Sequence, residues 1–251
     1  MKRFALLLLL ALGAQVHAES RPILQASWQG IEDYGTSPLH WTQDDAAWLI
    51  PTIMGTGILW NNDVYFHDLL STGSARKTWL DQSMPTVSTL GEGWSELPLV
   101  LLGYWLGDER FTRTSGVALQ SLAVAAVYTE VFKEAAWSNR PSQDAKEHRL
   151  WAYDQASKGM PSGHTFAAFA LAEAYGSEYG RVLPYSLAAI MGYSRIYNEA
   201  HWSSDVFVGA ILGIAAGHLS HKAANEKGAP ALRWSLQQRG NAQVLMAQWA
   251  Y

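Results

Sequence analysis

Three short blocks of this sequence carry the residue types that phosphate chemistry requires. They are Lys133 to Pro141, Pro161 to His164 and Ser194 to Asp205. Together they hold three cationic side chains, two histidines, an aspartate and a Ser-Gly turn in a fixed order. Cations and main-chain amides bind phosphate oxygens, and a histidine can serve as a nucleophile or a general acid. The set predicts a phosphate-handling active site.

The first block contributes two cations. Lys133 and Arg140 are seven residues apart, which is two helical turns, so we expect both on one face of a helix that runs from about Thr114. Pro141 disfavours helical geometry at the residue before it, so Arg140 is expected where this helix ends. Two cations on a helix are also typical of an ordinary solvated face.

The second block precedes an apolar helix that starts at Thr165. Ser162 is placed to cap that helix, and Gly163 lets a ligand approach the main chain closely. The amides of Gly163, His164 and Thr165 would then lie at the positive end of the helix dipole, where phosphate binds readily. An ordinary capped helix with a surface histidine would have the same local sequence.

The third block pairs a histidine with a carboxylate. His201 and Asp205 are four residues apart, so the carboxylate can hold one ring nitrogen and leave the other to act as a nucleophile. Arg195 would diverge from His201 by about 120° on one continuous helix, so we expect a break near Asn198 to Ala200. A His-x-x-x-Asp pair by itself is also typical of a structural hydrogen bond.

Jointly, the blocks resemble the signature of the type 2 phosphatidic acid phosphatase superfamily, which bacterial class A acid phosphatases and vanadium haloperoxidases share. That signature is Lys, six residues, Arg-Pro; then Pro-Ser-Gly-His; then Ser-Arg, five residues, His, three residues, Asp, and every position is filled here. The resemblance covers about residues 85–220, including Gly91-Glu92-Gly93-Trp94 and Leu97-Pro98. It implies an all-α helical bundle of the phosphatase/haloperoxidase type.

The resemblance also implies a role for each matching residue. His201 would attack phosphorus and form a phosphohistidine, Asp205 would orient it, and His164 would protonate the leaving oxygen. The substrate phosphate would be bound by five residues: Lys133, Arg140, Ser162, Gly163 and Arg195. We expect no metal ion and no cofactor. Because His201 must be neutral while His164 is protonated, we expect a bell-shaped pH dependence with the acidic limb set by His201.

Apolar segments long enough for helices lie at 46–60, 95–107, 114–137, 165–176, 183–197 and 203–219. We divide the chain into a signal peptide at 1–18, a loop-rich lead-in at 19–45, a helical phosphatase domain at 46–225 and a C-terminal extension at 226–251. An uncleaved membrane anchor is the alternative interpretation of residues 1–18. The lead-in is polar and contains Gly30, Gly35 and Pro38. The extension reads as a β-hairpin, with strands at 231–237 and 242–250.

Composition limits the partners. Without residues 1–18, the 16 basic and 22 acidic residues give a net charge of −6, which argues against binding nucleic acid or an anionic lipid surface. The chain has no cysteine, which excludes disulfides and thiolate sites.

The longest uncharged run in the helical region, Thr114 to Thr129, has 16 residues. That length favours a water-soluble or peripheral bundle over a membrane-spanning one.

The function expected is a phosphatase that acts on a phosphomonoester or a diphosphate, either free in the periplasm or associated there with the membrane. Lipid phosphates such as phosphatidate, phosphatidylglycerophosphate, prenyl diphosphate or lipid A are favoured slightly. Alternatives are a non-specific acid phosphatase on soluble esters, a vanadate-dependent haloperoxidase and a non-catalytic envelope scaffold. Six histidines outside the blocks are interpreted as structural or surface residues: His17, His40, His67, His148, His218 and His221.

Overall fold

The computed structural model describes residues 21–43, 47–91, 95–154, 158–227, 231–239 and 242–250. Its helices are α2 Arg21–Thr36, η2 Ser37–His40, α4 Leu49–Asn61, α5 Asp63–Ser71, η3 Gly73–Ala75, α6 Thr78–Leu90, α7 Glu96–Leu106, α8 Glu109–Ala136, α9 Gly163–Tyr179, α10 Val182–Tyr197 and α11 Ser203–Lys227. The all-α bundle expected from the sequence is confirmed, and all six expected apolar segments are helical. The expected signal peptide lies outside the described residues.

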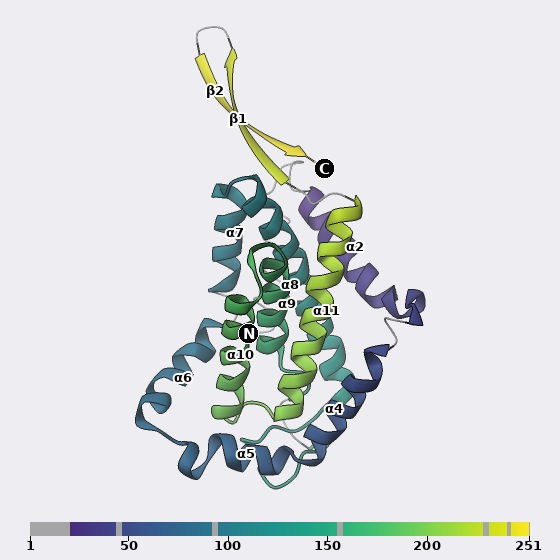
Figure 1. Cartoon of the computed structure of the whole chain (residues 1–251), viewed down its shortest axis with the longest axis vertical. Helices are drawn as coiled ribbons and strands as arrows, with labels where there is room; N and C mark the ends of the chain where they lie inside the picture. The colour runs from purple at the N-terminus through teal and green to yellow at the C-terminus, as the bar shows by residue number, and fades with distance from the viewer. Residues whose placement is uncertain are drawn as a thin grey trace.

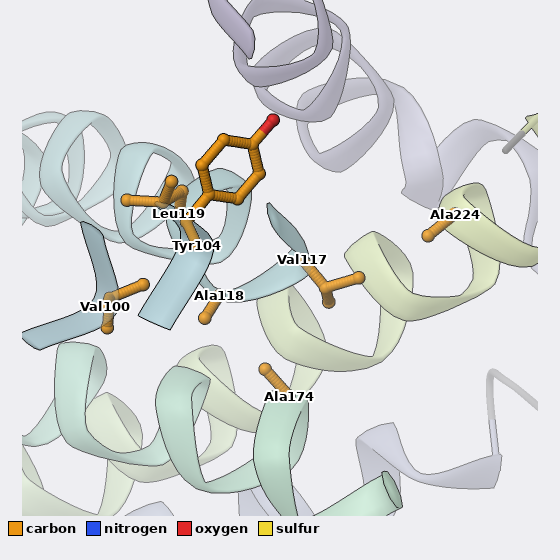
Figure 2. Packing of buried hydrophobic residues seen from close by; sticks show 7 residues of the cluster. All are labelled: Val100, Tyr104, Val117, Ala118, Leu119, Ala174 and Ala224. Carbon is orange, nitrogen blue, oxygen red and sulfur yellow. The ribbon is translucent and has the colours of Figure 1, made fainter. Parts of the chain in front are cut away.

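Helix α9 forms the centre of the bundle and packs against α8, α10 and α11 (Figure 1). One core cluster joins α7, α8, α9 and α11 through seven buried residues, Val100, Tyr104, Val117, Ala118, Leu119, Ala174 and Ala224 (Figure 2). Most of these side chains are small, so the helix axes approach one another closely.

Helix α11 is held against α9 by a row of glycines. Gly209, Gly213 and Gly217 recur every four residues and so share one face of α11. A Cβ atom on Gly209 would lie 2.6 Å from the carbonyl oxygen of Ser162, and one on Gly217 would lie 2.8 Å from that of Ala170. The helices therefore pack backbone to backbone, which fixes the position of the start of α11 relative to the start of α9.

The loop-rich lead-in expected at 19–45 is wrong, because α2 occupies most of it. The glycines that suggested a loop are close-packing positions. A Cβ atom on Gly30 would lie 2.6 Å from the side chain of Gln120, and Gly35 faces the hydroxyl of Tyr128. Tyr34 is buried, with its ring centroid 4.6 Å from that of Tyr128. Contact with α8 thus stabilises a helix that its own sequence supports poorly.

Two antiparallel strands follow α11, in the range where the sequence indicated a hairpin. Strand β1 spans Ala231–Arg239 and β2 spans Ala242–Ala250, with Ala231 opposite Ala250 and Arg239 opposite Ala242. The hairpin projects from the end of the bundle where α11 finishes (Figure 1). The connections from α8 to α9 and from α10 to α11 lie at the opposite end.

Candidate active site

The three sequence blocks meet at that opposite end, where α8 and α10 finish and α9 and α11 begin. Lys133 lies in the last turn of α8, and its Nζ is 3.7 Å from Oε1 of Glu130. Helix α8 ends at Ala136, and Trp137 follows it in the left-handed conformation. Arg140 therefore lies in the connection after the helix, which corrects the expectation that both cations share one helix face.

The guanidinium of Arg140 ties two connections together. Its Nη1 donates to the carbonyl of Ala200 at 3.2 Å, and its Nη2 donates to that of Lys158 at 3.0 Å. Its Nε is buried and has no hydrogen-bond partner among the described residues. Arg140 is thus fixed in orientation while one N–H remains available for a ligand.

Ser162 immediately precedes α9, as expected, but its hydroxyl makes no capping bond to the helix amides. The hydroxyl oxygen instead accepts from Oγ1 of Thr165 at 2.9 Å. The first main-chain bond of α9 runs from Phe166 to Ser162, so the amides before Phe166 have no partner within the helix. The Ser162 amide donates to the carbonyl of Asp205 at 3.0 Å, which joins the start of α9 directly to α11.

The expected break between Arg195 and His201 is confirmed. Helix α10 ends at Tyr197, and Glu199 adopts a positive φ of 55°. The amide of His201 donates back to the carbonyl of Arg195 at 3.2 Å, so the chain folds sharply at this point. Arg195 is buried, and its Nη1 donates to the hydroxyl of Ser88 in α6.

His201 lies just before α11 and not within it, so it and Asp205 do not share a helix face as the sequence suggested. The pair still forms, because Nδ1 of His201 is 3.4 Å from Oδ2 of Asp205. The same oxygen accepts from the amide of Trp202 at 3.0 Å. Both side chains are at most 2% exposed. Since Asp205 holds Nδ1, Nε2 is the ring nitrogen left for chemistry.

Burial and nearby positive charge act together on the two site histidines. They lower the pKa of His201 well below its usual value, and the cations responsible are Arg140, Arg195 and Lys133. Burial and the same three cations lower the pKa of His164 to about 3. The Nε2 atom of His164 is buried without a hydrogen-bond partner in the described part of the chain. Both imidazoles are therefore neutral near pH 7 while the site is empty.

His148, interpreted from the sequence as structural or surface, belongs to this site. Its side chain is 2% exposed, and its Nε2 lies 3.6 Å from Oδ1 of Asp205. His67 is also buried, whereas His40 and His218 lie at the surface. No local spacing pattern identified His148, because its partners lie far away along the chain.

The described geometry can be compared with known proteins. Residues 116–229 match the family model of the PAP2 superfamily. We call the matched residues the PAP2 domain. This PAP2 domain contains all three sequence blocks, and α2, α4, α5, α6 and α7 lie outside it.

Relatives resemble parts of the chain to different extents. A lipid A 1-phosphatase of Porphyromonas gingivalis is 44% identical over 79 residues, which cover 29% of this chain and 18% of that protein. The match thus spans less than a fifth of this relative's length.

Two solved structures share the fold of the PAP2 domain and its neighbouring helices. The crystal structure of Aquifex aeolicus LpxE has a TM-score of 0.53 and 24% identity, over 63% of this chain and 93% of that one. That of a transmembrane PAP2-type phosphatidylglycerolphosphate phosphatase from Bacillus subtilis has a TM-score of 0.50 and 20% identity, over 82% and 97%.

Proposed function

We propose that the protein is a metal-independent phosphatase that removes phosphate from a lipid through a phosphohistidine intermediate. The observation that carries the proposal is the convergence of three cations on two neutral histidines, the buried His201, which is held by Asp205, and the half-buried His164. The PAP2 family match and the local identity to a lipid A 1-phosphatase support the same reaction class.

The cations and the first amides of α9 would bind the phosphate group. Arg140 has an unused Nε–H, and a Cβ atom on Gly163 would lie 3.8 Å from Nζ of Lys133, so this lysine stands beside the start of α9. These groups are fixed before substrate arrives. Preorganised positive charge stabilises a phosphoryl transition state without rearrangement of the site.

Nε2 of His201 would attack phosphorus as the bond from phosphorus to the leaving oxygen breaks. The leaving oxygen takes a proton from the imidazolium of His164. A water molecule then attacks the phosphohistidine and gives one of its own protons to His164, which releases inorganic phosphate and restores neutral His201. Asp205 holds the positive charge that develops on the His201 ring.

Substrate binding would itself cause the protonation of His164 that these reaction steps require. In the empty site, burial and the three cations keep His164 unprotonated, with its pKa at about 3. A phosphate dianion offsets those cations and raises the proton affinity of the nearby imidazole. The acid is therefore formed only after the substrate has bound.

The outer surface favours a lipid substrate and membrane association. Large apolar side chains are exposed on several helices, among them Ile50, Ile53 and Ile58 on α4, Leu99, Leu102 and Leu106 on α7, and Leu183, Leu187 and Ile190 on α10. Two helices, Glu109–Ala136 and the segment Ser203–Glu226 of α11, are long and apolar enough to cross a membrane. Such a surface is costly in water, so it weighs against the water-soluble bundle that segment lengths favoured. The basic and apolar start of the chain is our reason to propose export to the periplasm.

Phosphate release by the full chain, purified in detergent with EDTA present, tests the proposal. Phosphatidate, phosphatidylglycerophosphate, undecaprenyl diphosphate and lipid A would be compared with p-nitrophenyl phosphate. We expect hydrolysis of at least one lipid at a higher kcat/KM than the soluble ester, and its loss in His201→Ala. A preference for the soluble ester would instead favour an acid phosphatase, and peroxidation of bromide only after addition of vanadate would favour a haloperoxidase. Equal release by the wild-type protein and by His201→Ala would overturn the mechanism.

A further inference from the structure

The imidazole of His148 stacks on two aromatic rings beside the candidate site. Its ring centroid lies 3.7 Å from that of Trp60 in α4 and 5.1 Å from that of Trp202, with interplanar angles of 26° and 21°. Both contacts are stacked, so the ring can neither tilt nor flip without displacing an indole. The orientation of its two nitrogens is therefore fixed by packing.

Each ring nitrogen of His148 faces a buried carboxylate. Nδ1 lies 2.7 Å from Oδ2 of Asp63, and Nε2 lies 3.6 Å from Oδ1 of Asp205. Both carboxylates are 1% exposed or less. Nε2 of His148 and Oδ1 of Asp205 are both buried without a hydrogen-bond partner among the described residues. A shift of a few tenths of an ångström would pair these two atoms with each other.

Asp205 thus has one oxygen for each histidine. Oδ2 is directed to Nδ1 of His201 and to the Trp202 amide, while Oδ1 faces His148. Asp63, at the start of α5, also accepts from the amide of Ser204 at 2.9 Å and from its hydroxyl at 2.5 Å. A residue outside the PAP2 domain is therefore tied to the first turn of α11, next to the nucleophile.

The position of His148 between two carboxylates favours a cationic ring. A carboxylate oxygen accepts hydrogen bonds, so two carboxylates on one imidazole require protons on both nitrogens. A cation that lies between two buried carboxylates stabilises the ionised form of both. Four other charged or titratable groups lie near the cluster in the described part of the chain. The Nδ1 atom of His201 contacts Asp205, the charges of Arg140 and Lys133 act on Asp205, and the ring of His67 lies 5.7 Å from that of Trp202.

We propose that His148 is a positioning residue that acts through Asp205, and that Asp63 keeps it as an imidazolium. His148 would fix the rotation of the Asp205 carboxylate, and so the direction of Nε2 of His201. Its positive charge would also oppose protonation of His201, which must be neutral to act as a nucleophile. This inference rests on the proposed phosphatase activity.

Two substitutions distinguish the contribution of the Nδ1 contact of His148 from that of its Nε2 contact. In His148→Asn the side-chain amide lies near the former Nδ1 and can keep the contact to Asp63, whereas in His148→Gln it reaches toward the former Nε2 and Asp205. We expect kcat to fall roughly tenfold to a hundredfold in His148→Asn, less in His148→Gln, with KM nearly unchanged in both. Equal loss in both, with lower thermal stability and an unchanged pH profile, would mean that His148 only supports the fold.

The pH profile gives the readout that a merely structural role would not move. Removing a positive charge from beside Asp205 makes His201 easier to protonate, so the acidic limb of kcat/KM should move to higher pH by about half to one unit in both variants. His67→Gln is the matched control, because His67 is buried against the same Trp202 but contacts Asp68. Its acidic limb should stay in place. A limb unmoved in the His148 variants would overturn the proposal.

The charge state can be measured without turnover. With ¹⁵N-labelled histidine, NMR of the whole protein in detergent at pH 7 should show one imidazole with both nitrogens protonated. That signal should vanish in His148→Gln and become that of a neutral ring in Asp63→Asn. A neutral His148 in the wild-type protein would refute the inference. Absence of phosphatase activity, with the imidazolium present, would instead count against the proposed function.

Discussion

Glu173 and Asp205 are both buried carboxylates that lie beside histidines, and their surroundings differ. Glu173 in α9 has a side chain that is 4% exposed, and it accepts from three groups, the hydroxyls of Ser177 and Tyr185 and the guanidinium of Arg181. The side chains of His218 and Arg181 beside it are 67% and 66% exposed. Asp205 instead faces His201 and His148, each only 2% exposed, and one of its oxygens has no partner within hydrogen-bond distance among the described residues.

The comparison distinguishes a carboxylate that stabilises the fold from one that is poised for chemistry. At Glu173, hydroxyls and surface cations satisfy the acceptor oxygens, so little is gained by any further ligand. At the Asp205 end, several buried polar atoms lack partners within the part of the chain that the structure describes, including Nε of Arg140 and Nε2 of His164. Unsatisfied buried groups cost stability, so their concentration at one end of the bundle is typical of a functional site.

The largest expected effect is the difference in activity between substitution of His201, beside Asp205, and substitution of His218, beside Glu173. His201→Ala should lower kcat/KM by about 10⁴ or more, because the proposed nucleophile is lost. His218→Ala, beside Glu173, should leave kcat/KM within about twofold of wild type, since it removes a mostly exposed ring. Phosphate release at saturating and limiting lipid concentrations measures both. A comparable loss of kcat/KM in the two variants would contradict the distinction between a functional Asp205 and a structural Glu173.

The two carboxylates should respond in opposite ways to loss of charge. Asp205→Asn should reduce kcat by roughly 10² to 10⁴, because the tautomer and the developing charge of His201 are no longer controlled. Glu173→Gln should lower the thermal midpoint while kcat/KM stays nearly constant. Kinetics and thermal unfolding of both variants in one detergent provide the measurement. A larger kinetic loss in Glu173→Gln would reverse the assignment.

Stability should depend on pH through the candidate site. The pKa of His164 falls from the ordinary 6.5 to about 3 in the folded protein, so only the unfolded chain binds a proton between these values. Stability is therefore lost as pH drops below 6.5, by up to about 1.4 kcal/mol per pH unit for this one group. Thermal unfolding between pH 7 and pH 4 should show a shallower loss in His164→Asn than in the wild-type protein. His218→Asn is the control, and an equal slope in all three proteins would contradict the electrostatic account.

The smallest expected effect on activity and stability concerns the row of glycines on α11, Gly209, Gly213 and Gly217, which packs against α9. Gly213 faces the carbonyl of Phe166, so Gly213→Ala should destabilise the bundle by roughly 1 to 3 kcal/mol and also lower kcat by displacing the start of α11. A Cβ atom on Gly57 in α4 would meet nothing within 4 Å, so Gly57→Ala should be neutral or stabilising by about 0.5 to 1 kcal/mol. Denaturant unfolding of the pair, with activity measured in parallel, makes the comparison. Equal stability in both variants would show that α11 does not depend on this contact.

Local sequence predicted much of this arrangement. The order of the blocks and the spacing from Arg195 to His201 predicted the break after α10, because a helix cannot direct both side chains to one place. Apolar periodicity predicted α4 and α7 through α11. These features depend on residues a few positions apart.

Other features depend on contacts between distant residues, so sequence patterns did not reveal them. Asp63 and His148 are 85 residues apart, and neither lies in a recognisable spacing. Helix α2 was missed because Gly30 and Gly35 are loop signals locally and close-packing positions only when α8 is present. Arg140 was assigned to a helix face by its spacing from Lys133, whereas the chain leaves the helix at Trp137.

Helices α8 to α11 alternate in direction, so the connections between them lie alternately at the two ends of the bundle. This arrangement indicates where a label or a fusion can be placed. The chain turns at the catalytic end through the long connection after α8 and the short one after α10, and both carry residues of the candidate site. The turn between α9 and α10 lies at the other end, where Gly180 adopts a φ of 99° and a Cβ atom there would meet nothing within 4 Å. A fluorophore or an affinity tag inserted at Gly180 would therefore sit a full helix length from the chemistry.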